Sequence, residues 1–187
     1  MAHGIWRCIQ LHDQLSNTAI LFIDLINDFQ FEGGEKLLTH TESILPNLLK
    51  LRQFADEQKL PIIYINDHYQ LWQSEPNVIL NHCLNPANKH IIQQIKPRKT
   101  DYFLIKPQHS AFYQTPLHSL LKELGRTHLI IAGIAGDICI LFTAKDAHTQ
   151  AFTLHIPKNC IASEQEDRNK YALYLMESVM KANIEPI

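Results

Sequence analysis

Residues 129–139 read LIIAGIAGDIC, and this stretch decides the fold. The apolar run Leu129–Ile134 is too short for a buried helix and predicts a buried β-strand. After a tight turn of small residues, an apolar spacing predicts a buried helix that begins at about Ile138, with Asp137 as its N-cap. The members of that spacing are Ile140, Leu141, Ala144 and Ala147. A strand that passes through a tight turn into a helix is half of a βαβ unit.

Four further runs of the same kind occur along the chain and predict four further strands. They are Ala19–Ile23, Pro61–Ile65, Tyr102–Ile105 and Thr153–Ile156. Helical spacings separate or follow them: Ile44, Leu48, Leu51 and Ala55 share one face, as do Tyr171, Leu175 and Val179. Ser163 and Glu166 have the spacing of a capping box for the last helix. The segment from Asp67 to Ile95 is the least regular, and we expect it to include a long loop that could act as a lid. Alternating strands and helices predict a three-layer α/β/α domain with a doubly wound, mainly parallel sheet.

Composition limits the class of protein. The chain has 187 residues, of which 45% are hydrophobic and 19% charged, which predicts one globular domain over residues 1–187. With 17 basic and 19 acidic residues, the net charge of -2 gives no basic field for nucleic acid. No stretch approaches the roughly 18 continuous apolar residues of a membrane span, and the N-terminus has no apolar signal region. The cysteines at positions 8, 83, 139 and 160 show no C-x-x-C spacing, so we expect free thiols and a cytoplasmic protein.

Reactive side chains follow the predicted strands. The carboxyl ends of parallel strands meet at one edge of the sheet, so Asp24, Asp67, Lys106 and Cys139 should share a rim. The first turn of a helix and a nearby ammonium would stabilise a Cys139 thiolate. Asp24 can then act as a base, with Lys106 holding the carboxylate and the thiolate together. Spacing alone leaves open that Cys139 is one more buried cysteine and Lys106 a surface lysine.

Several motifs occur in the order of a known family. They are Asp24-x-x-Asn27-Asp28-Phe29, Gly33-Gly34, Lys106-Pro107-x-x-Ser110-Ala111-Phe112 and Gly133-Ile134-Ala135-Gly136-Asp137-Ile138-Cys139. With these motifs the chain resembles the isochorismatase-like cysteine hydrolase superfamily, which includes nicotinamidases and N-carbamoylsarcosine amidases. The resemblance implies a Rossmann-like fold, a catalytic triad of Asp24, Lys106 and Cys139, and a cis peptide between Ile134 and Ala135. Such a bond would aim the Ala135 N–H toward the same point as the Cys139 N–H, forming an oxyanion hole.

The resemblance implies a cysteine-dependent hydrolase that cleaves a small amide or ureido substrate through a thioester. Two alternatives remain open: acid-catalysed cleavage of a vinyl ether, as in isochorismatases proper, and a silent binding or assembly module. A nucleotide-binding function is excluded because no G-x-G-x-x-G or P-loop motif follows a strand. By analogy with the superfamily we expect a homo-oligomer, a dimer or tetramer.

The sequence departs from the nicotinamidase pattern at the metal position. Nicotinamidases bind a divalent metal through an Asp-x-His and a further His, whereas this chain reads Asp67-His68-Tyr69. The ligand pair is therefore broken, and although Asp67, His68 and His82 could converge, we expect no metal and no other cofactor.

Aromatic residues near the predicted rim are candidates for binding a planar substrate. Phe29 and Trp72 are the first choices for stacking, and His109 and Tyr113 the next. Each of the first two is equally compatible with a place in the core.

Overall fold

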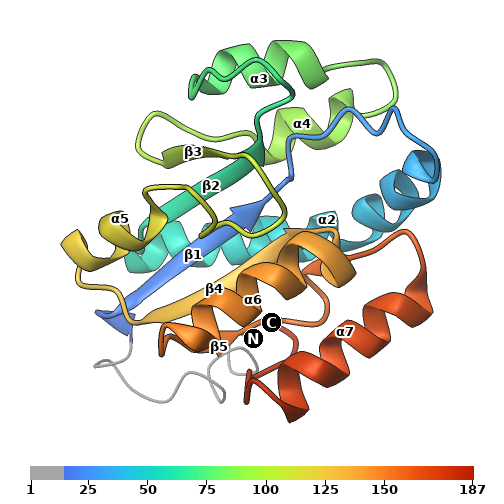
Figure 1. Ribbon diagram of the computed structural model, residues 1–187. Helices are drawn as coiled ribbons and strands as arrows, with labels where there is room; N and C mark the ends of the chain where they lie inside the picture. Colours follow the sequence, from blue (N-terminus) through green and yellow to red (C-terminus); the bar gives the residue numbers. More distant parts are fainter. Residues whose placement is uncertain (1–14) are drawn as a thin grey trace.

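The computed structural model describes residues 15–187 (Figure 1). Cys8 and the N-terminal segment, for which we predicted a free thiol and no signal region, lie outside the described residues. A six-stranded sheet has the order β3-β2-β1-β4-β5, and β6 also pairs with β4. The strands are β1 (Thr18–Ile23), β2 (Ile62–Asp67), β3 (Tyr102–Lys106), β4 (His128–Ile134), β5 (Thr153–His155) and β6 (Ile161–Ala162). Each described pair within the sheet is parallel, which confirms the predicted α/β fold.

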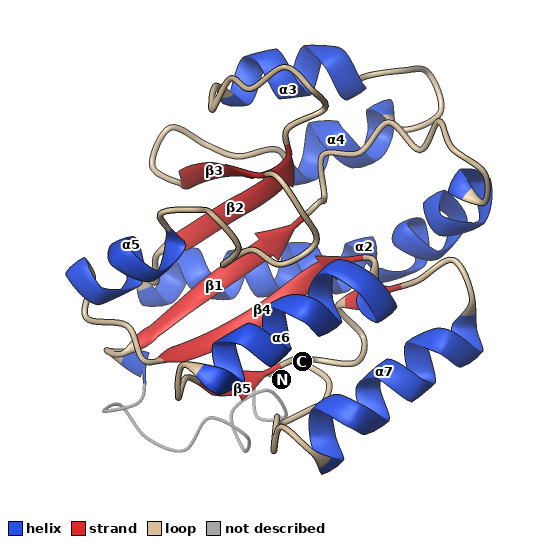
Figure 2. Ribbon diagram, viewed as in Figure 1, coloured by secondary structure: helices blue, strands red, loops and turns tan. Residues whose placement is uncertain are grey.

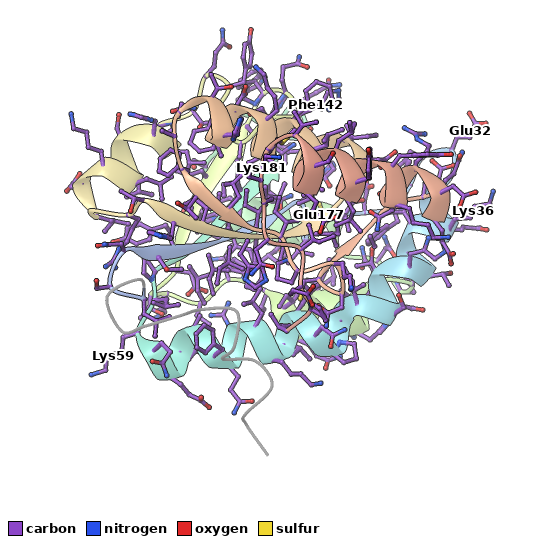
Figure 3. The ribbon with its side chains drawn as sticks, turned by 90° about the horizontal axis from the view of Figure 1, so that it is seen from below. Glu32, Lys36, Lys59, Phe142, Glu177 and Lys181 are labelled. Carbon is purple, nitrogen blue, oxygen red and sulfur yellow. The ribbon has the colours of Figure 1, made fainter. Side chains whose placement is uncertain are left out.

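Helices cover both faces of the sheet (Figure 2). In chain order they are α2 (Gly34–Gln58), α3 (Pro76–Cys83), α4 (Lys89–Ile95), α5 (Leu117–Glu123), α6 (Leu141–Thr149) and α7 (Glu166–Ser178). A π-helical turn, η2 (Gly136–Ile140), precedes α6. Figure 3 shows the layers on either side of the sheet, with Lys59 at the end of α2 on one side and Phe142 of α6 on the other.

The strands divide their side chains between two cores, as the two-residue period of a strand requires. Ile20 and Phe22 of β1 pack with α2 and α4 in one cluster. Leu21 and Ile23 of the same strand pack with α5, α6 and α7 in the other. This double burial explains why the strand segments are almost continuously apolar.

Two local expectations were wrong, and a third is narrowed: the segment expected to include a long loop has irregular chain between β2 and α3, and the rest of it forms mainly α3 and α4. Asp137 does not cap a helix, because η2 begins at Gly136 and thus includes Asp137. Ser163 and Glu166 form no capping box: no side chain caps the start of α7, and the Ser163 hydroxyl bonds to the Asp137 N–H and to the Asn169 side chain. Sequence spacing cannot distinguish a cap from a long-range contact of the same hydroxyl.

Within the described residues, no helix is long and apolar enough to cross a membrane.

Candidate active site

Asp24 directly follows β1 and turns its carboxylate toward the neighbouring strands. Its backbone is left-handed, with φ at 52°, and its N–H donates to the Ile65 carbonyl of β2 at 3.0 Å. One carboxylate oxygen, Oδ1, accepts the backbone N–H of Asp67 at 2.9 Å. The other, Oδ2, lies 2.9 Å from Nζ of Lys106. Asp24 is therefore buried and held from two sides.

Lys106 is the last residue of β3, and its ammonium joins the other two members of the predicted triad. Besides the contact with Asp24, Nζ lies 3.5 Å from Sγ of Cys139. Burial by itself lowers the pKa of Lys106, but the Asp24 carboxylate and Cys139 more than offset this, so its pKa is raised. The ammonium thus stays charged although the side chain is almost completely buried.

Cys139 lies in η2, directly after the carboxyl end of β4. Burial raises the pKa of its thiol, and the Asp24 carboxylate raises that pKa further, while Lys106 acts in the opposite direction. Burial and the Asp24 carboxylate together outweigh Lys106, so the raised pKa of Cys139 favours a thiol over the expected thiolate in the resting protein.

The turn between β4 and η2 has an unusual backbone. The peptide bond between Ile134 and Ala135 is cis. Gly133 has φ at 130°, and a Cβ atom there would lie 2.1 Å from the Ile23 carbonyl of β1, so no other residue fits. The Ala135 carbonyl accepts the N–H groups of both Ile138 and Ile140, each at 3.1 Å. These bonds wind the chain immediately into η2 and place Cys139 at the rim.

A hydroxyl from another element holds this turn. Ser163 Oγ accepts the Asp137 N–H at 3.0 Å and donates to Asn169 Oδ1 at 2.7 Å. A Cβ at Gly136 would lie 2.1 Å from the same Asn169 oxygen. Ser163 is buried, and its own carbonyl is bonded to the His40 ring at 2.7 Å. We predicted none of these tethers, because the partners come from distant parts of the sequence.

Two buried asparagines brace the loop that follows Asp24. Asn66 Oδ1 accepts the Ile26 N–H at 3.2 Å, and its Nδ2 donates to the Ile26 carbonyl at 2.7 Å. Asn88 Nδ2 donates to the Asn27 carbonyl at 2.8 Å. Asn66 is the penultimate residue of β2, a position that marks it as a rim residue, but its partner could not be inferred from sequence.

The triad opens into a cavity of about 410 Å³. Asp24, Lys106, Cys139 and Ala135 line it, so the structure brings the predicted catalytic residues and the predicted oxyanion-hole residue together. Ile134, on the other side of the cis bond, is fully buried. A cavity of this size suits a small molecule.

The two predicted stacking residues do not line this cavity. Phe29 is buried in the core beneath α2, whereas Phe31, two residues later, lines the cavity and is 49% exposed. Trp72 is 66% exposed and stacks on His68, with ring centroids 4.0 Å apart. For Phe29 the core interpretation is therefore the right one, and Trp72 is a surface residue.

The residues at the nicotinamidase metal position do not fit a metal ion. The Tyr69 hydroxyl donates to the Ile26 carbonyl at 3.1 Å, and burial raises the pKa of this phenol, so it supplies no anionic ligand. The His68 ring stacks on Trp72, and the His82 ring lies 5.2 Å from that of Tyr69. Among the described residues, no three His, Cys, Asp or Glu side chains are grouped as metal ligands.

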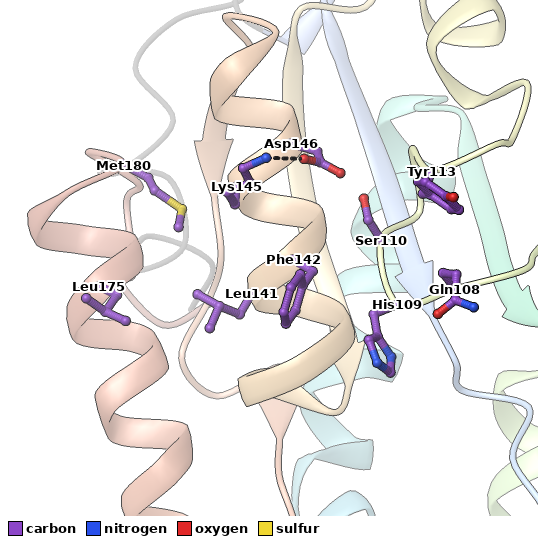
Figure 4. Close-up of a pocket in the computed structure, with 10 residues that line it drawn as sticks. All are labelled: Gln108, His109, Ser110, Tyr113, Leu141, Phe142, Lys145, Asp146, Leu175 and Met180. Carbon is purple, nitrogen blue, oxygen red and sulfur yellow. Dashed lines mark hydrogen bonds and ion pairs between the residues drawn. The ribbon is translucent and has the colours of Figure 1, made fainter.

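A second cavity, of about 650 Å³, lies between α6, α7 and the segment after β3 (Figure 4). Its walls are mainly apolar and include Leu141, Phe142 and Leu175. In the part of the chain that the structure describes, His109 and Tyr113 line it but no triad residue does. His109 also lines the first cavity, beside Asp24, Lys106 and Cys139, whereas Tyr113 does not, so of these two weaker candidates only His109 stays near the predicted triad.

Comparison with known proteins identifies the family. The model of the isochorismatase domain matches residues 18–184, nearly the whole chain. The chain belongs to the isochorismatase family. This family member is 51% identical over 169 residues to the uncharacterized isochorismatase family protein YaaI of Bacillus subtilis, covering 90% of this chain and 93% of that protein. It is 30% identical over 144 residues to a probable inactive nicotinamidase of Arabidopsis thaliana, covering 70% and 72% of the two chains.

Solved structures of related proteins have the same fold. The nicotinamidase PncA from Bacillus subtilis superposes with a TM-score of 0.70 at 26% identity, over 90% of this chain and 99% of that one. The N-carbamoylsarcosine amidase from Thermoplasma acidophilum has a TM-score of 0.69 at 21% identity, over 91% and 96% of the two chains. The second likeness concerns the fold alone.

Proposed function

We propose that this isochorismatase-family protein is a cysteine amidohydrolase that cleaves a small amide or ureido substrate through a thioester. The observation that carries the proposal is the position of the Lys106 ammonium, which contacts the Asp24 carboxylate at 2.9 Å and the Cys139 sulfur at 3.5 Å. A base, a cation and a nucleophile thus line one small cavity. A nicotinamidase and an N-carbamoylsarcosine amidase share this fold, which is consistent with this chemistry.

In the first half-reaction, the Cys139 sulfur attacks the substrate carbonyl carbon while its proton passes to Asp24. The raised pKa of Cys139 favours proton transfer that accompanies the attack. The carbonyl electrons move to oxygen, and the N–H groups of Ala135 and Cys139 are the proposed donors to this oxyanion. The C–N bond then breaks, Asp24 protonates the departing nitrogen, and an acyl thioester remains.

In the second half-reaction, water attacks the thioester and gives a proton to Asp24. The C–S bond breaks, the sulfur recovers the proton, and the acid product leaves. Lys106 stays charged throughout and stabilises whichever of its two neighbours carries negative charge. For a ureido substrate, the product of this step is a carbamic acid, which loses carbon dioxide.

The test is ammonia release from a panel of small primary amides and ureides, measured for the wild type and for Cys139→Ala. Cys160→Ala is the matched control, because Cys160 is a buried cysteine of the core cluster under α2. We expect turnover in the wild type and the control but none in Cys139→Ala. When hydroxylamine is added to compete with water, the wild type and the control should also form a hydroxamate.

Three outcomes would count against the proposal. Ammonia release that survives Cys139→Ala would exclude the thioester route. Pyruvate release from isochorismate that persists in Cys139→Ala would favour vinyl ether cleavage. A folded wild type that hydrolyses no member of the panel would favour a silent binding module.

A further inference from the structure

The catalytic cavity has an unequal charge balance. Five carboxylates line it, from Asp24, Asp28, Asp67, Asp137 and Glu164. Among the described residues of its lining, only Lys106 and Arg168 carry a permanent positive charge. The excess of negative charge is local, because the whole chain has a net charge of only -2.

Both cations are already neutralised within the protein. Lys106 is paired with Asp24 at 2.9 Å, and both side chains are buried. Arg168 Nε lies 2.7 Å from Asp137 Oδ2, and the Asp137 side chain is only 8% exposed. Neither cation is therefore free of a carboxylate when a substrate enters.

Over residues 15–187, the other three carboxylates, those of Asp28, Asp67 and Glu164, form no ion pair, although the Glu164 carboxylate lies against Gly33 at the start of α2. Oδ1 of Asp28 accepts the Gln30 N–H at 3.0 Å, and Oδ1 of Asp67 accepts the Tyr69 N–H at 2.7 Å. These bonds orient the two carboxylates. The Asp67 carboxylate acts on the Lys106 ammonium of the neighbouring strand, whereas Asp28 has no ion pair among the described residues.

An aromatic ring lines the same cavity. Phe31 is 49% exposed, and it belongs to the loop that also carries Asp28. Aromatic faces attract cations through the ring quadrupole, and carboxylates attract them through charge. Phe31, Asp28 and Glu164 therefore all favour binding of an ammonium group in this cavity and disfavour binding of a carboxylate.

We propose that the substrate of this enzyme is an amide that carries a cationic group, such as a protonated amine. This inference rests on the proposed amidohydrolase function and adds the charge of its substrate. The scissile carbonyl lies at Cys139, and the ammonium is bound by the carboxylates of Asp28 and Glu164, with Phe31 against it. An amide that carries a carboxylate meets repulsion from the same groups.

The first experiment needs no turnover, because it measures alkylation of Cys139 by reagents of different charge. Iodoacetate is anionic, iodoacetamide neutral and 2-bromoethylamine cationic; each forms a C–S bond and releases halide. Rates at Cys139, located by peptide mass, are divided by the rates of the same reagents with N-acetylcysteine. We expect the cation-to-anion ratio at Cys139 to exceed unity by about tenfold at low ionic strength and to shrink in high salt.

Variants assign the effect to particular carboxylates. Asp28→Asn and Glu164→Gln should each lower the cation-to-anion ratio severalfold. Asp167→Asn is the matched control, since the Asp167 side chain is 85% exposed and paired with Lys170 outside the cavity lining. A ratio at or below unity in the wild type would overturn the proposal.

The second experiment compares three amides of similar size: 4-aminobutyramide, pentanamide and succinamate. We expect kcat/KM to fall in that order, with the advantage of the cation reduced in Asp28→Asn and Glu164→Gln. Cys139-dependent hydrolysis without this order would refute the charge preference alone. Absence of hydrolysis of all three, with a clear cation preference in alkylation, would refute the proposed function but not the charge selectivity of the cavity.

Discussion

The Nζ atom of Lys106 lies 2.9 Å from Oδ2 of Asp24, and the two side chains are only 2% and 7% exposed. Desolvation of a buried ion pair offsets much of its attraction, so this contact is a poor way to stabilise a fold. It places a charged ammonium next to the sulfur of Cys139, at 3.5 Å. The arrangement is therefore better explained by chemistry at the sulfur than by stability.

Removal of one partner of this pair should destabilise the protein more than removal of both. Lys106→Met leaves the Asp24 carboxylate buried and unpaired, and we expect a loss of about 3–5 kcal/mol in the free energy of unfolding. The double variant Asp24→Asn/Lys106→Met should recover much of that loss while staying inactive. Urea unfolding and ammonia release measure the two properties, and a Lys106→Met protein as stable as the wild type would contradict this account.

The pH dependence of Cys139 alkylation tests the state of the resting thiol. Because burial and Asp24 raise the pKa of Cys139, the rate with iodoacetamide should keep rising with pH beyond the ordinary thiol pKa of about 8.5. Asp24→Asn removes a negative charge and leaves Lys106, so the pKa of Cys139 should fall and alkylation at pH 7 should become faster.

Cys83 and Cys160 are internal controls for that experiment. Both are buried, and burial raises the pKa of each thiol to about 12, so neither should react in the folded protein. A plateau of the wild-type Cys139 rate at pH 6–7 would instead reveal a preformed thiolate.

Strand geometry was sufficient to predict the sheet and a shared rim, whereas the triad was predicted from the family resemblance. Short apolar runs mark parallel strands, and their carboxyl ends must meet, which brings Asp24, Lys106 and Cys139 together. The resemblance of the motifs to the family predicted the cis peptide bond between Ile134 and Ala135, which the structure contains.

Residues in irregular backbone could not be predicted in this way. Phe29 has a left-handed φ of 57°, so neither a strand nor a helix period tells which of Phe29 and Phe31 turns inward. The contact of Asp137 with Arg168 joins η2 to α7, 31 positions away along the chain, and no local pattern reports it. Tertiary packing decides both cases.

The different surroundings of the two phenylalanines predict opposite effects of substitution. Phe29→Ala should cost about 3–5 kcal/mol in the free energy of unfolding, because it leaves a cavity in a packed core. Phe31→Ala should change that free energy by less than about 1 kcal/mol, since half of the side chain is already exposed. Phe31→Ala should instead raise KM for 4-aminobutyramide more than for pentanamide. Equal effects of both substitutions on thermal unfolding would show that the assignment of Phe29 to the core is wrong.

Ser163 should act as a positioning residue for the nucleophile turn. Its hydroxyl accepts the Asp137 N–H and donates to Asn169, so Ser163→Ala leaves both partners without this contact and should cost about 1–3 kcal/mol. Ser178→Ala is the matched control, because that hydroxyl only donates to the Tyr174 carbonyl on the exposed side of α7.

If Ser163 had a merely structural role, Ser163→Ala would lower the free energy of unfolding and leave kcat of the folded protein unchanged. If the hydroxyl positions η2, kcat should fall about tenfold in Ser163→Ala while KM changes little, since Asp28, Phe31 and Glu164 are untouched. Ser163→Thr keeps a hydroxyl and should restore part of kcat. Wild-type kcat in Ser163→Ala, measured well below its unfolding temperature, would show that the turn holds Cys139 without this tether.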